Sequence, residues 1–224
     1  MDSPLRKLRF NKDPVSWITH FAGFLAAVAG TAYLVGWSLD EPAKLTAMAI
    51  YGGSLIVLFL ASTAYHFFDL GDRGNRELQR LDHIGIYFLI AGSYLPPVMH
   101  LLDGRFRIAM LVTVGVILVL GTVQKIVWMD APVWLSTLIY LAFGWIGLVP
   151  AIASWSQMTW WGSACLVTGG AAYTVGAVVF TREWPDPWPR VFGHHEIWHV
   201  LVLVGAAGHF LFAATLLDVP VPAF

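Results

Sequence analysis

Seven apolar runs alternate with short polar or proline-bearing connections along the chain. A helix needs roughly 20 mostly apolar residues to cross the hydrocarbon core of a bilayer, and each run has about that length. The pattern predicts an all-α integral membrane protein, with residues 1–224 forming a single seven-transmembrane helix bundle. The expected spans are about 16–36, 43–67, 82–102, 107–128, 133–153, 158–181 and 194–217, with a polar connection from Asp69 to Arg80.

The composition agrees with this assignment. Of the 224 residues, 58% are hydrophobic and 12% are charged, and the mean hydropathy is +0.68. Soluble domains are about half apolar and about a quarter charged. The net charge of −1 provides no field that would attract a polyanion, so nucleic-acid binding is excluded. The single cysteine, Cys165, excludes an intramolecular disulfide.

The distribution of basic residues predicts the orientation in the membrane. Only Lys44, Arg105 and Arg107 lie on one side of the predicted bundle. The other ten of the 13 Lys and Arg residues lie on the side of the N-terminus: Arg6, Lys7, Arg9, Lys12, Arg73, Arg76, Arg80, Lys125, Arg182 and Arg190. Positive charge is enriched on the cytoplasmic side. We therefore expect a plasma (inner) membrane protein with a cytoplasmic N-terminus and a C-terminus outside.

Few ionisable residues lie inside the apolar runs, where they are costly and usually functional. When the seven spans are folded back and forth, three of them bring polar side chains to one depth of the cytoplasmic leaflet. These side chains are Ser62 and His66 in the second span, Asp82 in the third, and His195 and His199 in the seventh. Their convergence is the strongest functional signal in the sequence.

The spacing of these residues favours a metal site. His195 and His199 are four residues apart, so both imidazoles project from one helical face and can bind one cation. With His66, the three would leave a fourth position open, as in catalytic zinc sites. Imidazole also suits iron, copper and nickel, and Zn²⁺ is favoured. Asp82 is expected to hold a water, and Ser62 to orient that water or polarise a substrate carbonyl. Hydrogen bonding between helices is the alternative role for the histidines.

The other histidines are weaker candidates. His83 is expected to face a neighbouring helix or loop, and His194 to lie at the interface. His209 lies nearly three turns beyond His199, so we expect it to hydrogen-bond in the bundle interior. His20 is expected to pack in the core, with the wall of the metal site as the alternative.

The candidates lie within three short motifs. These are Ser62-Thr63-Ala64-Tyr65-His66, then Leu81-Asp82-His83-Ile84-Gly85-Ile86 with Ala91-Gly92-Ser93-Tyr94, and His195-Glu196-Ile197-Trp198-His199-Val200. They resemble the motifs of the progestin and adipoQ receptor (PAQR) superfamily, most closely those of its bacterial branch, the hemolysin III proteins. Family members often carry an acidic residue and an Asn before these motifs. Here Asp13 could stand for the acidic residue, and Ser16 occupies the Asn position.

The resemblance implies a seven-helix bundle with a cytoplasmic N-terminus and a zinc ion held by His66, His195 and His199. It also implies that Asp82 acts through water, with Ser62 nearby. The adiponectin receptors of this superfamily are associated with ceramide hydrolysis, and its wider relatives include alkaline ceramidases. For the bacterial members, the resemblance implies a role in lipid or membrane-energy homeostasis.

Three functions follow from these observations. The leading hypothesis is a zinc-dependent intramembrane hydrolase of lipid amides or esters, acting on membrane lipids such as a ceramide-like substrate. The second is a non-enzymatic membrane sensor or receptor with a structural zinc ion. The third is a pore-forming or transport protein of the hemolysin III type. It is less favoured because few acidic residues other than Asp82 lie in the spans.

Overall fold

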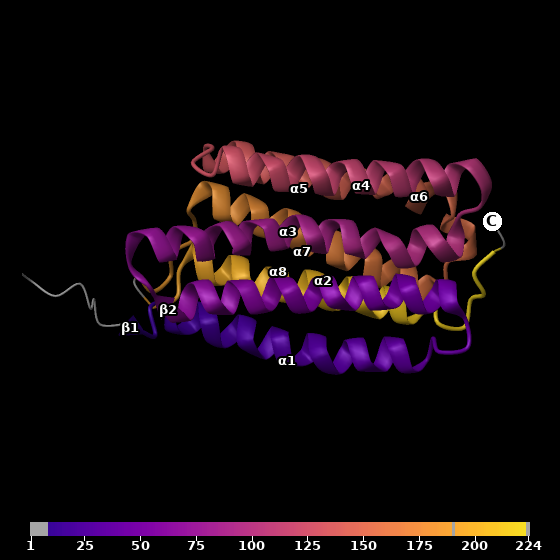
Figure 1. Cartoon of the computed structure of the whole chain (residues 1–224), viewed down its shortest axis with the longest axis horizontal. Coiled ribbons are helices and arrows are strands. Elements are labelled where there is room, and N and C mark those ends of the chain that lie inside the picture. The colour runs from indigo at the N-terminus through magenta and orange to yellow at the C-terminus, as the bar shows by residue number, and fades with distance from the viewer. Residues whose placement is uncertain (1–8, 190, 223–224) are drawn as a thin grey trace, which may run out of the picture.

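The computed structural model describes residues 9–189 and 191–222. Within these residues, seven helical segments are long and apolar enough to cross a membrane, and they lie side by side in one bundle (Figure 1). The predicted seven-helix membrane bundle is thereby confirmed. Arg6, Lys7 and Arg190, which contribute to the predicted charge asymmetry, lie outside the described residues.

The helices follow the order of the apolar runs. They are α1 (Pro14–Gly36), α2 (Pro42–Phe67), α3 (Gly71–Leu101), α4 (Gly104–Val127), α5 (Val133–Trp145), α6 (Leu148–Ala153), α7 (Trp160–Arg182) and α8 (His194–Ala214). Two short strands, β1 (Arg9–Phe10) and β2 (Phe68–Asp69), pair antiparallel at one end, and a 3₁₀ turn at Trp155–Gln157 precedes α7. Both α1 and α2 begin with a proline. Proline lacks a backbone N–H, and this causes no loss at the first helical position, because an N–H there would have no intrahelical acceptor.

Two helices differ from the pattern of the apolar runs. The segment from Asp69 to Arg80, expected as a connection, is mostly helical, because α3 already begins at Gly71. Its polar first turns include good helix formers such as Arg76 and Glu77, which continue the helix beyond the apolar stretch. The fifth span is divided into α5 and α6 at Ile146 and Gly147, where glycine weakens the helix.

Small residues set the distances between helices. A Cβ atom added at Gly208 of α8 would lie 2.8 Å from the carbonyl oxygen of Cys165 and 2.9 Å from the Cα atom of Gly169, both on α7. A Cβ atom at Gly92 of α3 would overlap the Ser54 hydroxyl of α2. In a membrane, where lipid is as apolar as the side chains, such close backbone approach is a main source of helix association.

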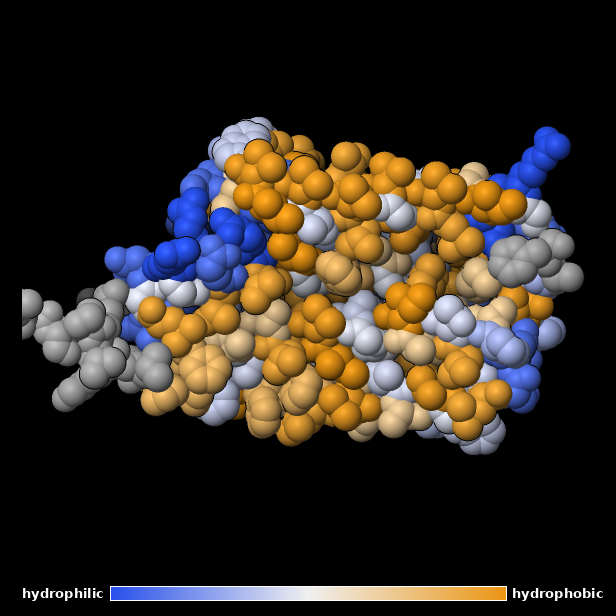
Figure 2. Space-filling model, in the orientation of Figure 1, coloured by the Kyte–Doolittle hydropathy of each residue, from blue (hydrophilic) through white to orange (hydrophobic). Residues whose placement is uncertain are grey.

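The surface has an apolar belt between two polar ends (Figure 2). Exposed aliphatic side chains such as Val112, Val119 and Ile126 contribute to this belt and would face lipid acyl chains. The β1–β2 pair lies at one end, and the C-terminus lies at the other (Figure 1). Seven spans would place the start of α1 and the end of α8 on opposite sides of a membrane.

Candidate metal centre

The chain before α1 is fastened to the end of α2. The β1–β2 pairing is followed by two hydrogen bonds, from Asn11 N to the Phe67 carbonyl (2.8 Å) and from Asp13 N to the His66 carbonyl (3.0 Å). Asn11 adopts a left-handed conformation (φ 67°) that asparagine tolerates better than most residues, and its side chain accepts a hydrogen bond from the Trp17 indole (2.7 Å). These contacts place Asp13 beside His66.

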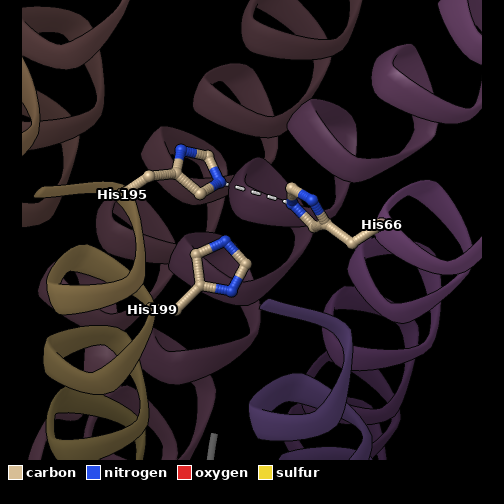
Figure 3. Close-up of side chains that lie close together, drawn as sticks. All are labelled: His66, His195 and His199. Atoms are coloured by element: carbon tan, nitrogen blue, oxygen red, sulfur yellow. Dashed lines mark hydrogen bonds between the residues drawn. The ribbon is translucent and has the colours of Figure 1, made fainter. Parts of the chain in front are cut away.

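Three histidines from two helices converge next to this segment. His66 lies in the last turn of α2, and His195 and His199 lie in the first two turns of α8. Their potential ligand atoms all lie within 4.8 Å of one another. The His66 and His195 Nε2 atoms are 3.5 Å apart, and the His199 ring lies below them, so the three rings surround one point (Figure 3). His66 and His199 are each only 3% exposed.

Asp13 fixes which nitrogen of His66 faces the other two rings. Its Oδ2 atom lies 2.8 Å from His66 Nδ1, and this hydrogen bond lowers the pKa of the Asp13 carboxyl below its ordinary value. A neutral His66 that donates its Nδ1 proton to this carboxylate would present its Nε2 lone pair to the centre. A carboxylate in this position is the usual partner of a metal-binding histidine.

The cluster fits a divalent transition metal. Two nitrogens that bind one tetrahedral zinc ion at about 2.0–2.1 Å lie roughly 3.3 Å apart, and the observed Nε2–Nε2 distance is 3.5 Å. Within the described residues, the cluster contains three potential ligands, all imidazoles. It could therefore hold a metal ion. Three protein ligands leave a position open for a fourth, which catalytic sites require and structural zinc sites usually lack.

Asp82 and Ser62 lie beside the cluster and are not part of it. Ser62 is one turn before His66 on α2 and is 1% exposed, and its side chain lies close enough to the Asp82 carboxylate on α3 to interact with it. Asp82 also lies close enough to His66 to interact with it electrostatically. All five site residues predicted from the sequence thus lie at the same end of the bundle, on α2, α3 and α8.

The other histidines lie in different surroundings. His20 of α1 stacks on His199, with 3.8 Å between ring centroids, so it is both packed in the core and part of the wall of the cluster. His209 lies 3.0 Å from the Gly205 carbonyl through Nδ1, which agrees with the expected hydrogen bond in the interior. His83 lies near α5, where the Tyr140 hydroxyl reaches its backbone carbonyl (3.4 Å).

Sequence reasoning missed the contacts of Asp13 and Ser16. Ser16 is fully buried, and its hydroxyl donates to Glu196 Oε1 (3.2 Å), while Glu196 Oε2 accepts from the Gly193 N–H (2.8 Å) at the start of α8. The signal in the sequence for a role of Asp13 was an acidic residue directly before a helix that begins with proline. The pattern of apolar and polar residues does not show that this segment pairs with the end of α2.

Seven membrane spans with a buried three-histidine cluster at one end define a polytopic membrane protein with a potential metal centre. A family model described as haemolysin-III related matches residues 8–210, so the chain belongs to this family. The resemblance seen in the sequence motifs is thereby confirmed.

Individual relatives support the same family. The chain is 30% identical over 196 residues to the hemolysin-3 homolog of Bacillus subtilis (strain 168), covering 86% of this chain and 88% of that protein. It is 33% identical over 189 residues to the heptahelical transmembrane protein ADIPOR2 of Oryza sativa subsp. japonica, with coverages of 76% and 81%. It is 29% identical over 196 residues to the monocyte to macrophage differentiation factor of Homo sapiens, with coverages of 86% and 79%.

The cluster leads to a prediction about metal content. The purified protein should carry about one metal ion per chain, and His66→Ala, His195→Ala and His199→Ala should each lose most of it, because two imidazoles form a much weaker site. Elemental analysis of each purified variant measures this. His83→Ala, which alters a histidine outside the cluster, is the matched control and should keep its metal. Full retention in His66→Ala would remove α2 from the site.

Proposed function

We propose that this protein is a zinc-dependent intramembrane hydrolase of lipid amides or esters. The observation that carries the proposal is the Ser62–Asp82 pair beside a three-imidazole cluster. A carboxylate that lies near the ligands but outside their set is available as a proton acceptor. Three imidazoles that leave a fourth position open favour catalysis over a purely structural site.

His66, His195 and His199 would hold the zinc ion as neutral imidazoles. When bound, zinc supplies Lewis acidity that activates water and polarises a carbonyl group. Asp82 accepts the proton that the attacking water loses as its oxygen bonds to the acyl carbon. The bond from that carbon to the amine or alcohol then breaks, and Asp82 returns the proton to the leaving group. Ser62 lies beside this carboxylate, and its hydroxyl would keep the carboxylate oriented toward the reacting water.

Membrane lipids are the proposed substrates, with a ceramide-like amide as the leading candidate. The cluster lies at the end of α2 and the start of α8, at the boundary between the apolar belt and a polar end. His195 and Asp82 are both partly exposed. A lipid whose acyl chains remain in the bilayer could therefore present its headgroup linkage at this depth. An intramembrane site suits a substrate that arrives by lateral diffusion.

A second candidate function is a non-enzymatic sensor in which zinc joins α2 to α8. It is favoured by one observation, that few backbone positions of α2 approach α8 directly within the described residues. Removal of the metal distinguishes the two functions. A structural ion predicts loss of the fold, whereas a catalytic ion predicts loss of turnover with the fold retained.

Substitution of Asp82 tests its catalytic role. Asp82→Asn keeps the size of the side chain but cannot accept a proton, so it should retain zinc and fold while lipid hydrolysis falls on the order of a hundredfold or more. The measurement is turnover of a panel of ceramides and acyl esters by purified protein in lipid nanodiscs. Asp130→Asn, which changes an exposed carboxylate paired with Arg76, is the matched control and should keep full activity.

The outcome also separates catalysis from packing. A structural Asp82 would make the variant less stable to heat, and whatever fraction still folds would hydrolyse lipid at the parent rate. Equal turnover by folded, zinc-loaded Asp82→Asn and parent protein would eliminate the proposed proton acceptor.

We further propose that the end with the metal centre lies in the cytoplasmic leaflet of the plasma membrane. The support is the excess of Lys and Arg on that side of the sequence. In a Cys165→Ser background, Arg105→Cys should react with a membrane-impermeant maleimide on intact cells, and Arg73→Cys should react only after permeabilisation. Both positions are exposed. The reverse labelling pattern would place the centre in the outer leaflet.

A further inference from the structure

One face of α1, with the residue just before it, contacts both helices that carry the histidine cluster. Asp13, just before the helix, contacts His66 of α2. Ser16 donates to Glu196, which lies between the two histidines of α8. His20 stacks on His199 with an angle of 24° between the ring planes. The offsets of three and four residues place all three side chains along the same stripe of a helix.

The same stripe is wedged between the two helices that carry the histidines. A Cβ atom added at Gly23, one turn beyond His20, would lie 2.6 Å from Leu203 of α8 and 2.9 Å from Phe59 of α2. Within the described residues, α1 packs along both helices, whereas few backbone positions of α2 approach α8. The separation between His66 and the α8 histidines therefore depends on the helix between them.

His20 has the properties of a spacer in this wedge. Its side chain is 4% exposed, and neither ring nitrogen has a hydrogen-bond partner among the described residues. Hydrogen bonding therefore does not account for the position of His20. Because burying an unpaired polar group costs free energy, other contacts must stabilise the ring there. Its ring instead makes two aromatic contacts, a stack on His199 of α8 and an edge-to-face contact with Phe59 of α2 (5.2 Å, 85°).

We infer that His20 is a positioning residue, which sets the plane and distance of His199 relative to His66 through the flat face of its ring, with Ser16 and Asp13 holding the other parts of the centre. Ser16 fixes the first turn of α8 through Glu196, and Asp13 fixes the orientation of His66. This inference rests on the metal centre of the proposed function, but not on any hydrolytic step.

The test uses metal binding by the full-length protein in detergent. Metal-free parent, His20→Ala, His20→Phe and Ser16→Ala are titrated with Zn²⁺ against a chromogenic chelator, and each is loaded with Co²⁺ for absorption spectroscopy. Loss of a group that orients a ligand typically weakens metal affinity 10–100-fold. His20→Ala should weaken zinc binding by about tenfold or more and shift the Co²⁺ bands, and Ser16→Ala should weaken it by a smaller factor.

The Phe variant distinguishes positioning from other roles. Phenylalanine keeps the flat ring and lacks nitrogen, so His20→Phe should restore zinc affinity to within about threefold of the parent and recover the Co²⁺ spectrum. If His20→Phe loses as much affinity as His20→Ala, the ring nitrogens matter and the inference is wrong. The same holds if His20→Ala binds zinc as tightly as the parent.

A matched control and a second readout separate positioning from general stability. His209→Ala removes another buried histidine of the bundle, and its zinc affinity should not change. The thermal midpoint of each metal-free variant reports on packing alone, and a loss confined to that midpoint would contradict the inference. Zinc binding that depends on His20 in a protein without lipid turnover would overturn the hydrolase and leave this inference intact.

Discussion

The packing of α1 between α2 and α8 is the arrangement on which the candidate metal centre depends. Lipid acyl chains are as apolar as the helix surfaces, so the hydrophobic effect does not select which helices pack together. Close packing and polar contacts therefore decide the arrangement. Here Gly23 permits the close approach, and Asp13 and Ser16 supply hydrogen bonds to the two helices that carry the histidines. The ligand geometry is therefore a property of three helices.

The polar residues of the bundle are concentrated near its two ends. At the end opposite the cluster, Lys44 donates to the Leu217 carbonyl (2.7 Å) and Arg107 to the Pro222 carbonyl (2.9 Å), so buried cations tie the C-terminal segment to α2 and α4. At the other end, the histidines and Asp82 lie one to three turns from a helix terminus or a polar stretch. This depth combines the burial that strengthens electrostatic interactions with a position close to one polar end of the bundle.

Much of this architecture can be predicted from the sequence, because each helix that crosses a bilayer needs an apolar run of a set length. Apolar length alone predicts the seven spans, and the fold back and forth then places His66, Asp82 and the α8 pair at one depth. The i,i+4 spacing of His195 and His199 predicts a shared helical face. The resemblance to a family implies the same three histidines as ligands of one zinc ion.

Other features depend on tertiary contacts that the pattern does not contain. The extension of α3 back to Gly71 lies in polar sequence, where apolar length gives no signal. The pairing of β1 with β2 joins segments far apart in the chain, and it is this pairing that brings Asp13 to His66. A histidine such as His20 looks the same in sequence whether it packs in the core or against a ligand, because both positions are apolar and buried.

X-ray absorption at the zinc edge tests the central claim most directly, because it counts and identifies the atoms around the ion. The full-length protein, loaded with one equivalent of Zn²⁺, should show three imidazole nitrogens at about 2.0–2.1 Å and one further oxygen or nitrogen atom. The imidazole signal should fall by about a third in His66→Ala. A parent spectrum with one imidazole or none, in an oxygen-rich shell, would contradict a metal centre built from His66, His195 and His199.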